Sequence, residues 1–266
     1  MDRNPWLRTP LLHCFLVVCL LLPACLSAQD APQSLPPPAQ VPNPNATAKE
    51  LEEQGDLLRS QKRYLDSIDF YKAAIAKKPS ALLWNKEGMA YLLLQRTEEA
   101  MKCFERASKL DKHDAASYNN RGYIQYRKQN YPQAINFYQK AISLHPSDAV
   151  FHYNMASAFF AMHKYKRAAQ EYQAAFKLEP DIFERVSKTG IMAQTTSPED
   201  RGAFSFMVAK MYAQAGDFNH SLEYLRKAME EGYKHINKVY TDAEFASLRE
   251  DKRFAELMAQ KPEPIQ

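Results

Sequence analysis

Histidines, a cysteine and pairs of neighbouring acids are the residues of this chain that could carry catalytic or metal chemistry. Imidazole nitrogens bind zinc or transfer protons, a thiolate is a nucleophile, and paired carboxylates can act as general acid and base. Downstream of residue 28 the histidines are His113, His145, His152, His163, His220 and His235. None stands four residues from a second ligand in a recognised metal-binding pattern, so we predict no metal site.

The cysteine and the acidic pairs give no sign of catalysis either. Cys103 lies in a helical pattern without a neighbouring base, which predicts a partly buried, inert thiol. The pairs Glu52–Glu53 and Glu98–Glu99 should lie on solvated helix faces, whereas catalytic carboxylates need burial to raise their pKa. Phosphate-binding loops, nucleophile elbows and dinucleotide fingerprints are also missing from the sequence. We therefore expect no enzyme and no cofactor; the remaining enzymatic alternative is a site built on residues 183–201.

A recurring alanine shows which elements position these residues. Its first three intervals are 33, 34 and 34 residues, and the last interval, of 53, is longer by 19. The alanines are Ala74, Ala107, Ala141, Ala175 and Ala228. Three residues before each stands a column of large residues: Tyr71, Phe104, Tyr138, Tyr172 and Leu225. Nineteen residues before each stands a column of small residues: Gly55, Gly88, Gly122, Ala156 and Ala209. Small residues at a fixed position predict the close approach of two helices in each repeat, and a period of this size predicts stacked repeats.

The second repeat carries the motif of a known family. Trp84, Gly88, Tyr91, Ala100 and Phe104 follow the pattern W-x2-L-G-x2-Y…A-x3-F, with Glu87 in place of the leucine. The chain therefore resembles a tetratricopeptide repeat (TPR) protein. This resemblance implies an all-α, right-handed solenoid of helix pairs, with repeats at about 48–80, 81–114, 115–148, 149–182 and 202–235. It also implies a protein-binding scaffold rather than a catalyst.

Three segments of the chain do not follow the repeat: one within it and one at each end. Residues 183–201 hold the extra 19 residues; we favour a plain linker, with a short helix near 182–188, a bend or a flap as alternatives. Ser197, Pro198 and Asp200 form a helix-start signal for the fifth repeat. Residues 236–266 should form capping helices and a tail, with Thr241 or Asp242 capping one short helix and Asp251 a second. Their apolar face comprises Phe245, Leu248, Phe254, Leu257 and Met258.

The N-terminal segment predicts export. Arg3 and Arg8 precede an apolar run from Leu11 to Leu22, which is typical of a signal peptide over residues 1–28, cleaved before Gln29. Lipidation at Cys25 and an uncleaved anchor are alternatives. Residues 29–47 are rich in proline and predict an extended linker. The expected location is periplasmic or secreted, as in exported bacterial TPR proteins. A glycosylation sequon at Asn45 or Asn219 would matter only in a eukaryotic secretory host.

Charge argues against nucleic acid as the partner. The formal net charge is +4, and it falls to +3 when residues 1–28 are removed. Basic residues are interspersed with acids rather than gathered in a stripe. Membrane contact is expected only through lipidation or an uncleaved signal, and no small-molecule substrate is indicated.

The first helix of each pair is expected to line a concave face that binds a peptide or protein segment. Asparagine side chains both donate and accept hydrogen bonds, which suits an extended main chain, and tyrosine and methionine serve as anchors. The candidate residues are Asn85, Lys86, Met89, Asn119, Asn120, Tyr123, Tyr153 and Asn154. Glu52 and Asp56 stand where some TPR proteins bind a C-terminal carboxylate, which excludes that ligand class. The alternatives are that these asparagines are only structural, or that the chain self-associates through its convex face or an end.

Overall fold

Helices account for the regular structure of this chain in a computed structural model, which describes residues 40–184, 193 and 198–260. The predicted signal peptide and most of the linker lie outside these residues. Within them the chain is all-α, and no helix is both long and apolar enough to span a membrane. The α-helices are α1 (Ala48–Ser60), α2 (Tyr64–Lys77), α3 (Ala81–Leu93), α4 (Thr97–Leu110), α5 (Ala115–Arg127), α6 (Tyr131–Leu144), α7 (Ala149–Ala161), α8 (Tyr165–Leu178), α9 (Pro198–Ala215), α10 (Phe218–Glu230) and α11 (Lys252–Gln260).

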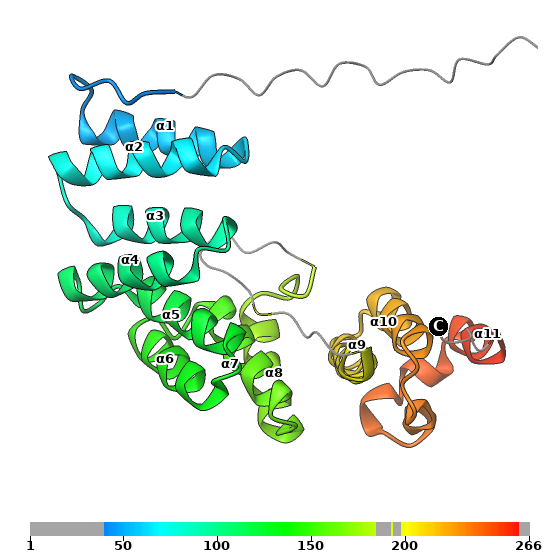
Figure 1. Ribbon diagram of the computed structural model, residues 1–266. Helices are drawn as coiled ribbons and strands as arrows, with labels where there is room; N and C mark the ends of the chain where they lie inside the picture. Colours follow the sequence, from blue (N-terminus) through cyan, green and yellow to red (C-terminus); the bar gives the residue numbers. More distant parts are fainter. Residues whose placement is uncertain (1–39, 185–192, 194–197, 261–266) are drawn as a thin grey trace, which may run out of the picture. The chain divides into compact units, whose positions relative to one another are not determined.

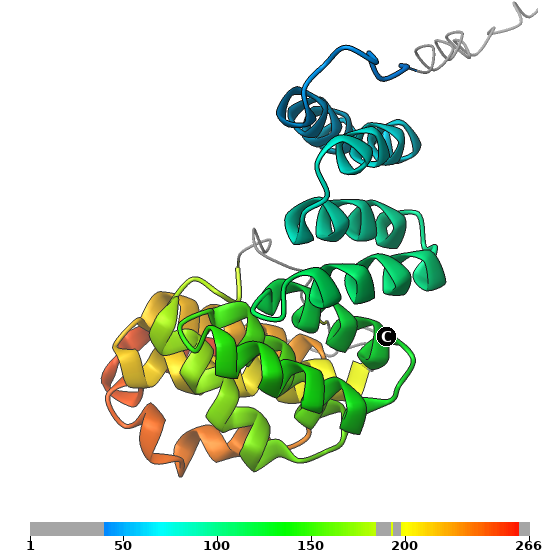
Figure 2. The same ribbon diagram turned by 90° about the vertical axis from the view of Figure 1, so that its left-hand side faces the viewer.

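The helices pair in sequence order, as the repeat predicts. Figures 1 and 2 show α1 to α8 as successive antiparallel pairs. Each odd-numbered helix from α1 to α9, here called an A helix, packs mainly on the B helix that follows it. Each B helix also packs on the next A helix as far as α7. Neighbouring A helices also touch, α3 with α5 and α5 with α7. The A helices therefore form the inner side of the stack, and the predicted α-solenoid is confirmed.

Capping and turn geometry explain where the helices begin and end. The Thr47 hydroxyl accepts from the Glu50 N–H while the Glu50 carboxylate accepts from the Thr47 N–H, a complete capping box for α1. Each A helix is followed by a tight turn that contains a residue with positive φ. These residues are Lys62, Gln95, Gln129, His163 and Gly216. Only the last is glycine. The other four turns therefore place a residue with a side chain in the left-handed backbone conformation, which is strained for any residue but glycine.

The column of large residues packs directly on the column of small ones. A Cβ added to Gly88 would lie 2.5 Å from Cε1 of Phe104, and one added to Gly122 would lie 2.6 Å from Cε1 of Tyr138. The rings of Tyr71, Phe104, Tyr138 and Tyr172 are completely buried. In each of the first three repeats, the aromatic side chain of the B helix thus fills the space that glycine leaves on the A helix.

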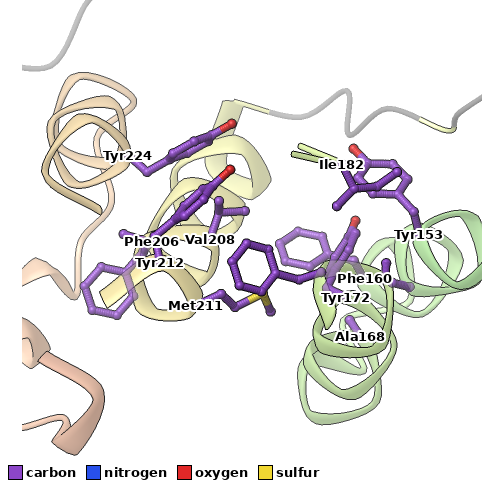
Figure 3. Close-up of a cluster of buried hydrophobic side chains, with 14 of the residues drawn as sticks. Tyr153, Phe160, Ala168, Tyr172, Ile182, Phe206, Val208, Met211, Tyr212 and Tyr224 are labelled. Carbon is purple, nitrogen blue, oxygen red and sulfur yellow. The ribbon is translucent and has the colours of Figure 1, made fainter. Parts of the chain in front are cut away.

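The fifth helix pair does not stack on the fourth in the regular way, because α8 and α9 make few direct contacts. Residues 180–184 join them instead. Ile182 is completely buried, and the Phe183 ring lies within 6.3 Å of five other rings, which belong to Tyr153, Tyr172, Phe176, Phe204 and Tyr212. Figure 3 labels Ile182, Tyr153, Tyr172 and Tyr212 among the buried side chains of this region.

At Phe183, Glu184 and Ala193 this packing differs from the plain linker that we expect over residues 183–201. The Tyr212 hydroxyl lies 3.2 Å from the Pro180 carbonyl oxygen and 3.0 Å from a Glu184 carboxylate oxygen, so it is within hydrogen-bond distance of both acceptors. Ala193 is also completely buried. Residues 182–184 form a turn rather than the short helix considered above, and 185–188 lie outside the described residues. Helix α9 starts at Pro198, beside the predicted cap.

The C-terminal unit has three 3-10 turns where the sequence predicts one short α-helix. They are η1 (Ile236–Tyr240), η2 (Ala243–Phe245) and η3 (Leu248–Glu250), followed by α11. The Asp242 carboxylate accepts from Lys210 at 2.9 Å instead of capping a helix. The predicted apolar residues Phe245, Leu248 and Phe254 are buried, as are Leu257 and Met258. This unit contacts both α9 and α10, and so covers the end of the fifth pair.

The contact between Gly88 and Phe104 yields a test by double mutation. We expect Gly88→Ala to lower the free energy of unfolding by about 1–3 kcal/mol, because its methyl group overlaps the Phe104 ring. Phe104→Leu should relieve the overlap, as repeat five pairs Ala209 with Leu225. In urea titrations the double variant should be more stable than the two single effects predict by about 0.5–3 kcal/mol. Strict additivity of the two changes would contradict this packing.

Candidate functional site

Three candidate asparagines form a hydrogen-bonded relay on the inner side of the A helices. Asn154 on α7 donates from Nδ2 to Asn119 Oδ1 on α5 at 2.7 Å. Asn119 donates from Nδ2 to Asn120 Oδ1 at 3.4 Å. All three side chains are completely buried. The structure therefore brings these predicted residues together, but it covers them rather than exposing them to solvent.

The cover over Asn154 is part of the chain itself. The N–H of Ala193 donates to Asn154 Oδ1 at 2.8 Å. The Ser157 hydroxyl lies 3.3 Å from the Ala193 carbonyl oxygen, 3.0 Å from that of Tyr153 and 2.9 Å from the Tyr172 hydroxyl. An asparagine and a serine one turn apart on α7 thus contact both main-chain polar groups of a single residue. Sequence reasoning selected Asn154 but missed Ser157, although Ser157 stands in the same column as Met89 and Tyr123.

Asn85 and Lys86 make contacts between repeats. Asn85 on α3 is buried and donates to the Asp114 carboxylate that precedes α5. Lys86 forms ion pairs at 2.5 Å with both Glu52 and Asp56 of α1, and its side chain is 18% exposed. The acids that exclude a carboxylate ligand are therefore neutralised in part by the lysine predicted to bind the partner.

The hydrophobic candidates differ in accessibility. Tyr153 is buried, with its ring edge-on to Tyr172 at 5.2 Å. Met89 and Tyr123 are half-buried, each on an A helix, and the Tyr123 hydroxyl accepts from Arg127 at 3.4 Å. The part of the predicted surface that a partner can reach in this conformation is consequently centred on Met89 and Tyr123, with Lys86 beside it.

The cysteine and the acids that could take part in catalysis are either buried in the helix packing or exposed on helix surfaces. Burial raises the pKa of Cys103 to about 12, so its thiol is protonated at neutral pH. Glu87, at the motif's leucine position, is 3% exposed, and burial raises its pKa. Glu98 and Glu99 are exposed, as expected. Throughout the part of the chain that the structure describes, no three His, Cys, Asp or Glu side chains are grouped closely enough to hold a metal ion.

His152 on α7 makes a short contact with a carboxylate on α8. Its Nδ1 lies 2.8 Å from a Glu171 carboxylate oxygen, and its Nε2 lies 3.1 Å from the Pro146 carbonyl oxygen. The hydrogen bond to Glu171 raises the pKa of His152. The side chain connects α7 with α8 and with the turn that precedes α7.

A hollow of about 610 Å³ between α8 and α9 was not predicted from the sequence. Tyr165 and Gln173 line it from α8, Met207 and Met211 from α9, and residues 232–235 close one side. The Lys210 ammonium lies in its wall, paired with Asp242 at 2.9 Å and Glu244 at 3.1 Å. This hollow exists because α9 does not pack closely on α8. The repeating residues of the sequence do not indicate the distance between these two helices.

Comparisons with known proteins agree on one family. Residues 115–148 and 149–182 match two models described as tetratricopeptide repeat, and residues 88–129 match a model described as TPR repeat. No curated protein sequence matches the chain.

Solved structures of low sequence identity are similar to parts of the chain. MamA 41-end from Desulfovibrio magneticus RS-1 has 16% identity and a TM-score of 0.48, covering 69% of this chain and 94% of that one. YrrB, titled a TPR protein with an unusual peptide-binding site, has 16% identity and a TM-score of 0.46, covering 73% and 91%. The first TPR of Spaghetti (RPAP3) bound to the HSP90 peptide SRMEEVD has 22% identity and a TM-score of 0.38, covering 47% and 91%.

The raised pKa of His152 predicts a dependence of stability on pH. A group whose pKa is higher in the folded state than in the unfolded state stabilises the fold below its unfolded pKa, and this contribution disappears as pH rises through its folded pKa. We expect His152→Gln to destabilise the protein more at pH 5.5 than at pH 8.5, measured by urea denaturation. Glu171→Gln should abolish the same pH-dependent difference. An equal effect of His152→Gln at both pH values would show that the ion pair contributes nothing.

Proposed function

This chain is a tetratricopeptide repeat protein, and we propose that it is a non-catalytic scaffold of the cell envelope that binds a peptide or protein segment along its A helices. The observation that supports this is the contact with Ala193. Asn154 and Ser157 already hold the main chain of a segment that belongs to no helix pair. Side chains of this surface can therefore bind a main chain in the way that peptide recognition needs.

The accessible part of the surface favours an elongated partner without a free carboxylate at the α1 end. Met89 and Tyr123 supply apolar area on α3 and α5, with Lys86 between the first two repeats. The side chains of Glu52 and Asp56 are 23% and 36% exposed and already pair with the Lys86 ammonium, so an added carboxylate would have to compete with them for this cation. Only Lys86 and Arg59 lie within ion-pair distance of these two acids in the described chain.

The envelope location is proposed from the N-terminal sequence. Arg3 and Arg8 before the apolar run support export, and Ala28 supports cleavage before Gln29. The segment after it is compatible with a spacer whose end is fixed on the first repeat. There the Lys77 ammonium donates to the Pro44 carbonyl at 2.8 Å.

A structural, self-associating role is the second candidate. Leu57 on the first helix is 49% exposed and Leu65 on α2 is 57% exposed, which gives the N-terminal repeat apolar surface. Light scattering of the mature protein separates the two proposals. A monomer at high concentration contradicts self-association, and a concentration-dependent dimer supports it.

The binding surface can be tested with two truncations and a matched control. Once a partner is identified by affinity capture from the native envelope and purified, Tyr123→Ala and Met89→Ala should each weaken its Kd about tenfold, because an anchor side chain contributes on the order of 1–2 kcal/mol. Leu65→Ala removes an exposed apolar side chain from a B helix and should leave the affinity unchanged. Thermal unfolding checks that all three variants fold. Undiminished affinity of both A-helix variants would exclude this surface.

The mature N-terminus tests the proposed location. Mass spectrometry of the protein from the native envelope should give a chain that begins at Gln29, because Ala28 is the small residue before the cleavage site. A diacylated chain that begins at Cys25 would instead establish lipid anchoring. Recovery of the full chain from the cytoplasm, with Met1 retained, would contradict export.

A further inference from the structure

Ala193 is held by its main chain in a position that belongs to the A-helix surface. Its N–H donates to Asn154 Oδ1 at 2.8 Å, its carbonyl oxygen lies 3.3 Å from the Ser157 hydroxyl, and the residue is completely buried. A helical residue uses its N–H and carbonyl within the helix, so both groups are available only from a non-helical main chain. The contacts with Asn154 and Ser157 therefore require a non-helical main chain at this position, and the burial of the residue requires a small side chain.

The relay fixes the polarity of this contact. Asn154 donates from Nδ2 to Asn119 Oδ1, which leaves Oδ1 as the atom directed at Ala193. An oxygen in this buried place needs a donor, because an unsatisfied buried acceptor is unfavourable. A main-chain N–H satisfies it, whereas proline, which lacks this hydrogen, does not.

The Ser157 end of the contact can release its ligand at little cost. A serine hydroxyl has one hydrogen, and the carbonyl oxygens of Tyr153 and Ala193 lie 3.0 and 3.3 Å from it. When the Ala193 carbonyl leaves, the hydroxyl keeps an acceptor within α7. Loss of Ala193 removes the N–H that donates to Asn154 Oδ1, and any other main-chain N–H placed there can donate in its stead.

We propose that Asn154 and Ser157 form a main-chain binding subsite for an extended segment with a small residue, and that Ala193 is its internal occupant. A partner segment of the same chemistry competes with Ala193 for this place. This inference rests on the proposed function, because it assigns a regulation to the same A-helix surface. It separates the surface into an accessible part at Met89 and Tyr123 and an occupied part at Asn154.

A peptide with the sequence of residues 189–197, TGIMAQTTS, is the probe for this subsite. Its binding is measured by fluorescence anisotropy to the full mature chain and to the variant Ala193→Leu, whose larger side chain does not fit the buried position. We expect at least tenfold tighter binding to the variant, since the internal competitor is removed. The matched control peptide TGIMLQTTS should bind neither protein.

A second variant keeps the test valid if Ala193→Leu does not fold. The substitution Ala193→Pro removes the N–H that donates to Asn154 Oδ1. This variant should also bind the probe more tightly than the unaltered chain does. Circular dichroism and thermal unfolding show whether each variant keeps its helices. Equal binding of the probe to all three proteins, or no binding to any folded variant, would overturn the proposal. Loss of partner affinity in Tyr123→Ala with no probe binding would leave the proposed function standing while this inference fails.

Discussion

A ring pressed against a glycine is the contact on which each of the first three helix pairs depends. With a side chain on Gly88, the A helix could not approach Phe104 as closely as it does. The close approach brings the two helices into one layer, and the layers can then stack with A helices touching along the inner side. The asparagine relay between α5 and α7 exists only because these neighbouring A helices are held at that spacing.

Repeat four shows how the same constraint changes when the glycine is replaced. Ala156 carries a methyl group there, and the facing Tyr172 is still completely buried. Its hydroxyl lies 2.9 Å from Ser157, so the ring is held by a polar contact as well as by packing. This repeat is also the one that binds residues 182–184 and Ala193. The repeat in which alanine replaces the glycine is thus also the repeat after which the regular packing of B helix on A helix ends.

The sequence could predict what recurs and could not predict what occurs once. Alanine, glycine and aromatic columns recur, so the helix pairs and their buried contacts follow from spacing alone. One partner of Asn154 is a main-chain group 39 residues away, and main-chain groups leave no trace in a sequence pattern. Lys86 was selected for its position on the A helix, yet its ion pairs with Glu52 and Asp56 depend on how two layers happen to be aligned. The positive φ of Gln95 and Gln129 was equally hidden, because it accompanies main-chain hydrogen bonds that close the helix ends, such as Arg96 N–H to the Tyr91 carbonyl, at positions where glycine is the usual residue.

The Phe183 cluster has a consequence for the way the molecule unfolds. In a stack of repeats, each unit is stabilised chiefly by its neighbours, so cooperativity passes from one layer to the next. Between α8 and α9 this transmission runs through a turn of a few residues and the rings around Phe183 rather than through a full helix interface. The last helix pair and the C-terminal unit are therefore coupled to the fourth repeat chiefly through this buried aromatic join, which belongs to one apolar core that extends from α5 to α11.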